Sequence, residues 1–267
     1  MKTQLDLRMG ASKGYDSYVK GLFAAGEKGA WYDPSDFSTM FQNIAGTTPV
    51  TAAGQPVGKI LDKSGNGFHM VAPADTVVRP TLMQDSAGKY YLDADGVDDK
   101  MSCANFYMNS AEMTLFVGVQ VELAGAFDML LELSPVIASN TNVFAAFSSL
   151  ATAINRLSFT SRGSASAASY QEPITLNQKY QWVSQGKLTA TSLSNVRLDD
   201  ITPIAAATNV NAQSGTAYGN HTLYMFSRNN IQFPFNGRVY AMVIRGAASS
   251  AAEILNIRAY LRSKMGV

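Results

Sequence analysis

The sequence has few of the residue types that usually mark a catalytic or metal site. Among 267 residues there is one cysteine, Cys103, and there are two histidines, His69 and His221. A lone cysteine excludes an intrachain disulfide and is compatible with folding in a reducing cytosol. The histidines lie far apart, and neither has a cysteine or histidine nearby, which is not the spacing of a zinc site. We therefore expect ordinary loop histidines, no metal, no cofactor and no catalytic residues.

Charge and long apolar runs are also scarce. Only 15% of the residues are charged, and 21 basic residues against 20 acidic ones leave a net charge of +1. Because a nucleic-acid-binding surface normally needs an excess of lysine and arginine, we expect no nucleic-acid partner. No apolar run approaches the roughly 18 residues of a membrane span, and residues 1–13 lack the apolar core of a signal peptide. We therefore expect neither a membrane span nor a signal peptide.

What the sequence does contain is a series of strands. Apolar residues occupy every second position from Met113 to Leu123, while Thr114, Gln120 and Glu122 fall on the opposite face. This period of two predicts a strand, because a helix would scatter the same residues. Similar runs follow without helical patterns between them, which predicts an antiparallel sandwich or jelly roll. The further predicted strands are 127–133, 142–148, 156–161, 179–185, 223–227 and 238–245.

One helix is predicted with a clear start and end, over residues 250–264. Ser250 and Glu253 have the spacing of a capping box, and Gly266 follows the last turn. The positions expected to face the core form one stripe, which consists of Ile254, Ile257 and Leu261.

Two groups of residues carry a resemblance to a known family. The later group is Phe235-Asn236-Gly237-Arg238 with its apolar continuation to residue 244, followed by the helix with Glu253-Ile254. The earlier group reads Trp-Tyr-Asp-Pro-Ser-Asp at 31–36, Thr-Thr-Pro-Val at 47–50, Asp-Lys-Ser-Gly-Asn-Gly at 62–67 and Tyr-Tyr-Leu-Asp-Ala-Asp-Gly-Val-Asp-Asp at 90–99. Together they resemble the opening and closing segments of laminin-G-like (concanavalin A-like) jelly-roll proteins in the virions of tailed bacteriophages.

The resemblance implies a fold and a role. The expected fold is a mainly β, antiparallel jelly-roll sandwich with an N-terminal extension (1–29), an irregular lead-in with one or two strands (30–88), and a sandwich with a closing helix (89–267). The expected role is that of a non-enzymatic structural virion protein: a capsid decoration, head-fibre or tail-associated subunit. It would assemble in the host cytoplasm with copies of itself and with capsid or tail proteins. The alternative is a lectin-like receptor-binding domain for a host surface glycan. No calcium-ligand pair can be placed around residues 188–198.

The N-terminal extension contains a stripe of apolar residues at spacings of three and four, which predicts a short amphipathic helix ending near Gly26. The stripe could fold back on the domain or dock to another subunit. Because the sandwich is already closed by its own C-terminal helix, and an exposed stripe would cost solubility, we expect it to dock to the virion or to a neighbouring subunit. The expected assembly contacts are Tyr15, Tyr18, Val19, Leu22 and Phe23.

An acidic cluster surrounds Gly96 and at first suggests a calcium loop. An EF-hand loop needs a bidentate Glu at its twelfth position, and counting from Asp93 that position is Ala104. We therefore favour a hairpin with its tight turn at Asp95-Gly96, in which aspartate side chains bond backbone amides. The members of the cluster are Asp93, Asp95, Asp98 and Asp99.

A second acidic pattern invites comparison with glycosidases. Asp128, Leu130 and Glu132 are predicted to share one strand face, and jelly-roll glycosidases carry a Glu-x-Asp-x-Glu strand. Here Leu130 takes the place of the middle acid. Residues four apart on a strand have Cα atoms about 13 Å apart, beyond the roughly 5–9.5 Å between the carboxyl groups of glycosidases. We expect a solvated strand face, no glycosidase activity and, more generally, no enzyme.

Aromatic residues are the remaining candidates for recognition. Trp31, Tyr32, Tyr180, Trp182 and Tyr218 could stack on sugar rings. We favour the core for Trp182, because both faces of its predicted strand carry apolar residues, and we leave Trp31 open. The stretches 164–169 and 205–219 are expected to be loops, where jelly rolls usually build recognition.

Overall fold

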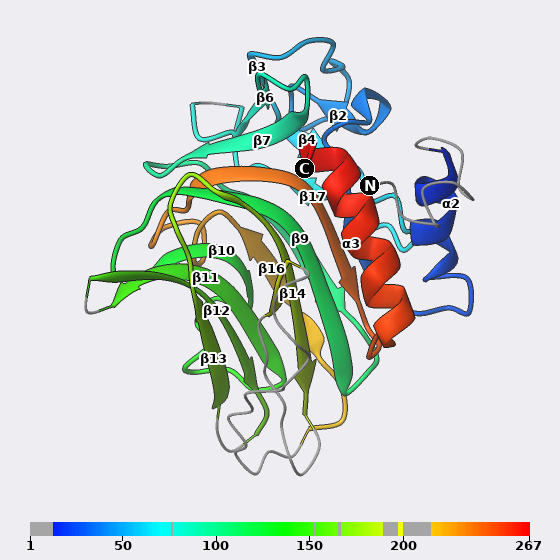
Figure 1. Cartoon of the computed structure of the whole chain (residues 1–267), viewed down its shortest axis with the longest axis vertical. Coiled ribbons are helices and arrows are strands. Elements are labelled where there is room, and N and C mark those ends of the chain that lie inside the picture. Colours follow the sequence, from blue (N-terminus) through cyan, green and yellow to red (C-terminus); the bar gives the residue numbers. More distant parts are fainter. Residues whose placement is uncertain (1–12, 76, 152, 165–166, 189–196, 200–214) are drawn as a thin grey trace.

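The computed structural model describes residues 13–75, 77–151, 153–164, 167–188, 197–199 and 215–267. Two antiparallel β-sheets face each other, and the helices α2 (Lys13–Gly21) and α3 (Ala251–Met265) lie on the outer side of one of them (Figure 1). The predicted mainly β sandwich with a short C-terminal helix is confirmed. Most of the predicted loop 205–219, and most of the stretch 188–198, fall outside the described residues.

Within the described residues, the first sheet has eight strands, and it carries the helices. β9 is its longest strand, and Met113, Leu115 and Val119 face the core between the sheets, as their alternation predicts. Phe116 on the other face packs beneath α3, so β9 is buried on both sides. In spatial order the strands are β15 (Arg197–Leu198), β14 (Lys179–Lys187), β9 (Glu112–Leu123), β17 (Asn236–Arg245), β7 (Tyr90–Asp95), β6 (Thr81–Gln84) and β3 (Gln55–Pro56), and β1 (Gly29–Tyr32) pairs with β17.

The second sheet has nine strands in the part of the chain that the structure describes. The apolar runs predicted to be strands are strands here or in the first sheet. Its edge strand β13 was not predicted, because the Ser- and Ala-rich sequence lacks an alternating pattern; its pairing with β12 supplies the backbone hydrogen bonds instead. In spatial order the strands are β13 (Ala167–Pro173), β12 (Ile154–Arg162), β11 (Val143–Ala151), β10 (Asp128–Leu133), β16 (Gly219–Met225), β8 (Met101–Tyr107), β5 (Met70–Val71), β4 (Lys59–Ile60) and β2 (Met40–Phe41).

The lead-in 30–88 is more regular than predicted. It holds short strands that extend both sheets, together with a 3-10 turn at Phe37–Thr39, where one or two strands were expected. β1 begins at Gly29, which has φ +138° and whose added Cβ would collide with the carbonyl oxygen of Ile244. Only glycine permits this close antiparallel pairing.

Helix α3 begins and ends as the sequence predicts. The Ser250 side chain accepts the N–H of Glu253, the Glu253 carboxylate accepts the N–H of Ser250, and Gly266 ends the helix in the left-handed conformation. Its buried face includes Ile254, Ile257 and Leu261, and it packs on β9, β14 and β17.

The predicted amphipathic helix is present as α2, but its apolar stripe is not left exposed. Val19 is fully buried, and Tyr18 is partly buried against the same cluster. The expectation that this stripe needs an outside partner is therefore wrong, because α3 and the first sheet cover it. Together with residues of α3 and of the first sheet, the stripe forms a second hydrophobic core outside the sandwich. Its buried stripe residues are Tyr15, Val19, Leu22 and Phe23.

Candidate functional site

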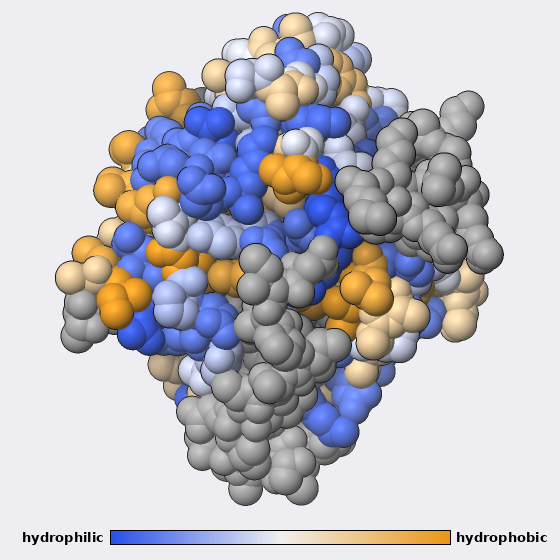
Figure 2. All heavy atoms as spheres, in the orientation of Figure 1, coloured by the Kyte–Doolittle hydropathy of each residue, from blue (hydrophilic) through white to orange (hydrophobic). Residues whose placement is uncertain are grey.

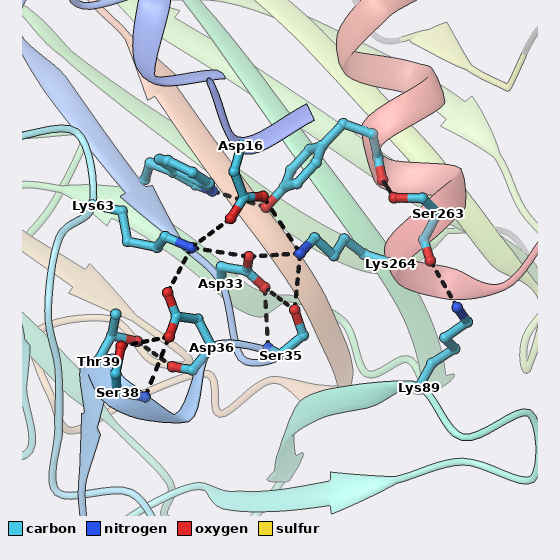
Figure 3. A network of polar contacts seen from close by, with 12 residues as sticks. Asp16, Asp33, Ser35, Asp36, Ser38, Thr39, Lys63, Lys89, Ser263 and Lys264 are labelled. Atoms are coloured by element: carbon cyan, nitrogen blue, oxygen red, sulfur yellow. Dashed lines mark hydrogen bonds and ion pairs between the residues drawn. The ribbon is translucent and has the colours of Figure 1, made fainter. Parts of the chain in front are cut away.

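The most concentrated charged cluster lies beneath the two helices (Figure 3). Asp33 is fully buried and its Oδ2 lies 2.8 Å from Lys264 Nζ and 3.4 Å from Lys63 Nζ. Lys63 also pairs with Asp16 at 3.1 Å and Asp36 at 2.8 Å. The cluster thus connects α2, the chain after β1, the loop after β4 and the end of α3. Three carboxylates and two ammonium groups from these segments pair with one another, so the cluster acts as a clamp.

Aromatic rings close this cluster from one side. Trp31 Nε1 donates to the hydroxyl of Tyr260 at 2.8 Å, and the Lys63 ammonium lies 4.3 Å from the Trp31 ring centre. Trp31 is 2% exposed. It therefore anchors the helices to the sheet and cannot stack on a sugar.

The clamp predicts a loss of stability in acid. Burial would raise the pKa of Asp33, but Lys264 and Lys63 outweigh it and hold this pKa below its usual 3.8. The Asp33 carboxylate therefore binds a proton more tightly in the unfolded state than in the folded state. The stabilisation that the charged Asp33 gives the folded state is complete above about pH 4, and it is lost as the pH falls through the lowered native pKa. At about pH 7, Asp33→Asn should cost about 3–5 kcal/mol, because two lysines lose their buried partner.

Urea unfolding at about pH 7 and about pH 3 measures this effect. The difference between wild type and Asp33→Asn should shrink at the lower pH. Asp75→Asn is the control, since its ion pair with Arg79 lies at the surface and should contribute less than about 1 kcal/mol. An equal difference at both pH values would contradict the role of the Asp33 charge.

The acidic cluster forms a crossover between the two sheets. β7 and β8 belong to different sheets, so the predicted hairpin is wrong. The predicted side-chain bonds are present: Asp95 Oδ1 accepts the N–H of Val97 at 2.8 Å, and Asp99 Oδ2 accepts the N–H of Asp95 at 3.0 Å. Burial, together with nearby Asp95 and Asp98, raises the pKa of Asp99 to about 7. Asp93, which lies within β7, does not belong to the group that Asp95, Asp98 and Asp99 form.

The glycosidase-like pattern does not share one face. A β-bulge in β10 interrupts the alternation, so that Asp128 pairs with Ser148 and Glu132 pairs with Ala145, which point to opposite faces of β11. The predicted solvated face is also wrong. Asp128 is 9% exposed, while Glu132 is fully buried and its Oε2 lies 2.8 Å from Arg228 Nε. Burial raises the pKa of both acids.

The remaining predicted residues lie apart. Trp182 is in the main core, as expected, and Tyr32 and Tyr218 are buried there too, so none of them can stack on a sugar. His69 Nδ1 accepts the N–H of residue 62 at 3.0 Å, and His221 lies half-buried in β16. Neither histidine belongs to a metal-like cluster in the described part of the chain.

Among the described residues, no helix covers the outer face of the nine-stranded sheet, and many of its central side chains are buried. The described helices lie on the opposite side of the sandwich (Figure 1). Phe147 marks this outer face, because its neighbours Phe144 and Ala146 belong to the main core while Phe147 belongs to a separate cluster. The strand register then aligns two cross-strand rows here: Met129, Phe147, Ser158 and Gln171 in one, and Glu132, Ala145, Thr160 and Ser169 in the other.

This face holds hydrogen-bonding groups that the described chain does not use. Ser149 and Ser158 are 4% and 0% exposed, and their Oγ atoms have no hydrogen-bond partner among the described residues. The Nε atoms of Arg156 and Arg162 also have no hydrogen-bond partner among the described residues, although Arg156 Nη1 donates to Gln171 at 3.3 Å. An unsatisfied buried polar group costs about 1–3 kcal/mol. Because both hydroxyl oxygens are buried, an external ligand could satisfy them only where the side chains that cover them move aside.

An aromatic cluster adjoins the polar rows. Phe127 is 47% exposed, and its ring centre lies 5.2 Å from that of Phe147 and 6.0 Å from that of Phe233. The Arg228 guanidinium lies 4.9 Å from the Phe233 ring centre, and Glu132 holds it in place. The exposed ring of Phe127 offers an apolar surface against which the C–H face of a sugar can pack.

Apolar residues continue along the edge of this sheet. Leu150 and Ile154 flank the β11–β12 turn and are 45% and 43% exposed. Figure 2 shows apolar residues at this edge of the molecule, while the neighbouring upper surface is mostly hydrophilic. We call Phe127, Phe147, Ser149, Arg156, Ser158, Gln171, Arg228 and Phe233 the outer-face site.

Sequence reasoning missed the outer-face site. Phe127 and Phe147 belong to predicted strands, but which face is open depends on where the helices pack. The β10 bulge further changes which residues share that face. A useful signal was present in the polar alternation of β12 at Ser158 and Thr160, which leaves one face of the strand hydroxylated.

Comparisons with known proteins support the fold. No protein-family model matches the sequence, and no curated protein matches it. A mutant GH54 α-L-arabinofuranosidase soaked with 4-nitrophenyl α-L-arabinofuranoside superposes with a TM-score of 0.59 at 9% identity, covering 92% of this chain and 65% of that one. This chain therefore spans just under two thirds of that enzyme.

Two further structures are similar. Domain 4 of AbnA, a GH43 extracellular arabinanase from Geobacillus stearothermophilus, in complex with arabinotriose, has a TM-score of 0.55 at 11% identity, covering 87% of this chain and 98% of that domain. Tailspike protein 2 of an Escherichia coli bacteriophage gives 0.44 at 12% identity, covering 69% and 26%, which is too distant to carry an argument. At these identities the similarity shows an antiparallel β-sandwich.

Proposed function

We propose that this chain is a carbohydrate-binding β-sandwich that holds a glycan on its outer-face site. The observation that carries the proposal is the pair of buried hydroxyls, Ser149 and Ser158, without partners among the described residues, together with the exposed ring of Phe127. The arabinanase domain with a similar fold was solved with arabinotriose, which adds support at the level of fold.

The chemistry of the site suits a neutral sugar. Hydroxyls and guanidinium N–H groups can exchange hydrogen bonds with sugar hydroxyls, and a phenyl ring packs against the C–H face of a pyranose or furanose. The Arg228 charge is already neutralised by Glu132, and Arg156 donates to the neutral amide of Gln171. A neutral oligosaccharide is therefore the proposed ligand class.

We also propose that the site binds without hydrolysis. Hydrolysis of a glycosidic bond normally needs two carboxyl groups about 5–9.5 Å apart that flank the bond. Here Asp128 and Glu132 point to opposite faces of the sheet, and Glu132 already pairs with Arg228 and accepts the N–H of Ile137 at 2.6 Å. Glu132 thus holds Arg228 and the backbone at Ile137 in position.

The proposed setting is the virion of a tailed bacteriophage, where a glycan-binding sandwich would meet the host surface. Its support is the resemblance carried by residues 31–36 and 90–99 early in the chain and by the β17–α3 segment at its end. Capsid and tail proteins, and further copies of the chain, are the proposed assembly partners, and the host cytoplasm is the proposed place of assembly. Immunogold labelling of intact particles tests this setting.

Glycan-array binding followed by calorimetry tests the carbohydrate proposal. We expect binding to a neutral oligosaccharide that is recovered uncleaved. Phe127→Ala and Ser158→Ala should each weaken binding about five- to tenfold, because a ring contact and a hydrogen bond are each worth about 1 kcal/mol. Both substitutions should leave the fold intact, since Phe127 is half exposed and Ser158 has no described partner.

The matched control is Leu255→Ala, which removes an exposed apolar side chain from α3 on the opposite side of the sandwich. Its binding should equal that of wild type. Unchanged affinity in both outer-face variants, or no binding to any glycan on the array, would overturn the proposal.

A further inference from the structure

The crossover between the sheets contains an acidic cluster that the clamp and the outer-face site do not use. Asp95, Asp98 and Asp99 each offer a carboxylate oxygen, and these atoms lie within 4.8 Å of one another. Calcium binds oxygen at about 2.3–2.6 Å, so ligands on opposite sides of one ion are about 5 Å apart. The three oxygens can therefore contact a single calcium ion.

Hydrogen bonds from backbone N–H groups hold these carboxylates in place and leave some of their oxygens available. Asp95 Oδ1 accepts the N–H groups of Val97 and Asp98, and Asp99 Oδ2 accepts the N–H of Asp95. The second oxygen of each of these two carboxylates remains for another ligand. Among the described residues, no lysine or arginine forms an ion pair with Asp95, Asp98 or Asp99.

An independent observation comes from a cavity that two of these acids share with another part of the chain. This cavity of about 100 Å³ is lined by Asp98 and Asp99 and also by Ser227 and Asn230. Ser227 is 4% exposed, and neither its Oγ nor the buried Oδ1 of Asn230 has a hydrogen-bond partner in the described part of the chain. Two buried oxygen atoms that can act as acceptors thus lack partners in residues that line the same cavity as Asp98 and Asp99. Lys100 also lines the cavity.

We propose that this cavity is a calcium site, in which the carboxylates of Asp98 and Asp99, the Ser227 hydroxyl and the Asn230 amide oxygen hold one ion. The carboxylate of Asp95, which adjoins those of Asp98 and Asp99, supplies the fifth oxygen. Five protein oxygens of these kinds, completed by water, match the six to eight oxygen ligands that calcium takes. Magnesium demands a smaller, near-octahedral arrangement, which two irregular loops are poorly suited to build.

The position of the site gives it a structural consequence. Asp95, Asp98 and Asp99 lie on the crossover from β7 to β8, and Ser227 and Asn230 lie on the crossover from β16 back to β17. An ion between them would join the two inter-sheet connections at one end of the sandwich. Because it binds the folded chain alone, it should raise the melting temperature.

Calcium titration of the metal-stripped full chain tests this proposal by calorimetry and thermal melting. We expect one ion per chain, with a Kd of about 10⁻⁴–10⁻³ M, and a higher melting temperature at about 10 mM calcium. Asp98→Asn and Ser227→Ala should weaken calcium binding by about tenfold or more and about threefold, respectively, and reduce the thermal shift. Both should melt like wild type without calcium, because Ser227 Oγ has no described partner and Asp98 is part-exposed.

Glu112→Gln is the matched control, because it removes one negative charge from an exposed ion pair with Lys187, away from the cavity. It should bind calcium as wild type does. Absence of binding heat and thermal shift, or calcium affinity unchanged in both cavity variants, would overturn the site. Equal stabilisation by magnesium would overturn its assignment to calcium.

Discussion

Val119→Asp is expected to unfold the protein or to lower its free energy of unfolding by at least about 4 kcal/mol. Val119 is fully buried between the sheets, in the middle of the strand that both neighbours β14 and β17 pair with. A carboxylate there would lose its hydration without gaining a partner, and such losses are comparable with the whole stability of a domain, about 5–15 kcal/mol. Urea unfolding followed by circular dichroism measures the change.

Leu123→Asp supplies the control on the same strand. Leu123 continues the same alternation but is 63% exposed at the end of β9, so its substitution should change stability by less than about 1 kcal/mol. Similar losses in the two variants would mean that the interior of the sandwich is not where the structure places it.

Removal of residues 1–28 is expected to destabilise the domain severely. It strips Tyr15, Val19, Leu22 and Phe23 from the second core and uncovers the face of α3 and the first sheet on which they pack. Full burial of side chains of this size stabilises by about 1.5–3 kcal/mol each, so the melting temperature should fall by at least about 10 °C. Thermal melting of the truncated chain tests this result.

Point variants separate the packing of α2 from other effects of truncation. Leu22→Ala should cost about 2–5 kcal/mol because it leaves a cavity, whereas Lys20→Ala on the exposed face of α2 should cost less than about 0.5 kcal/mol. A truncated chain that melts like the full chain would restore the idea that this segment serves an outside partner.

The β-fold could be predicted well because its signal is local. The alternation of Met113, Leu115 and Val117 and the capping box at Ser250 are set by the geometry of one strand and one helix. Strands without such a pattern were missed: β13 has little apolar alternation, and the short strands of the lead-in are held mainly by pairing with neighbours.

The candidate sites depended on contacts that are distant in sequence. The Asp93-to-Asp99 segment looked like a hairpin, but β7 and β8 pair with strands of different sheets, which turns the segment toward Ser227 and Asn230. The β10 bulge, which no local pattern announces, separates Asp128 from Glu132.

The sequence by itself determined that this chain is an antiparallel β-protein with a capped C-terminal helix and an amphipathic helix near its start. Those features follow from periodicity and end-capping, which act over a few neighbouring residues. The tertiary structure decided that the apolar face of α2 is buried, that no described helix covers the outer face of the second sheet, and that residues from two crossovers line one cavity. Burial and proximity depend on which surfaces the whole chain brings together, and residues more than a hundred positions apart set them.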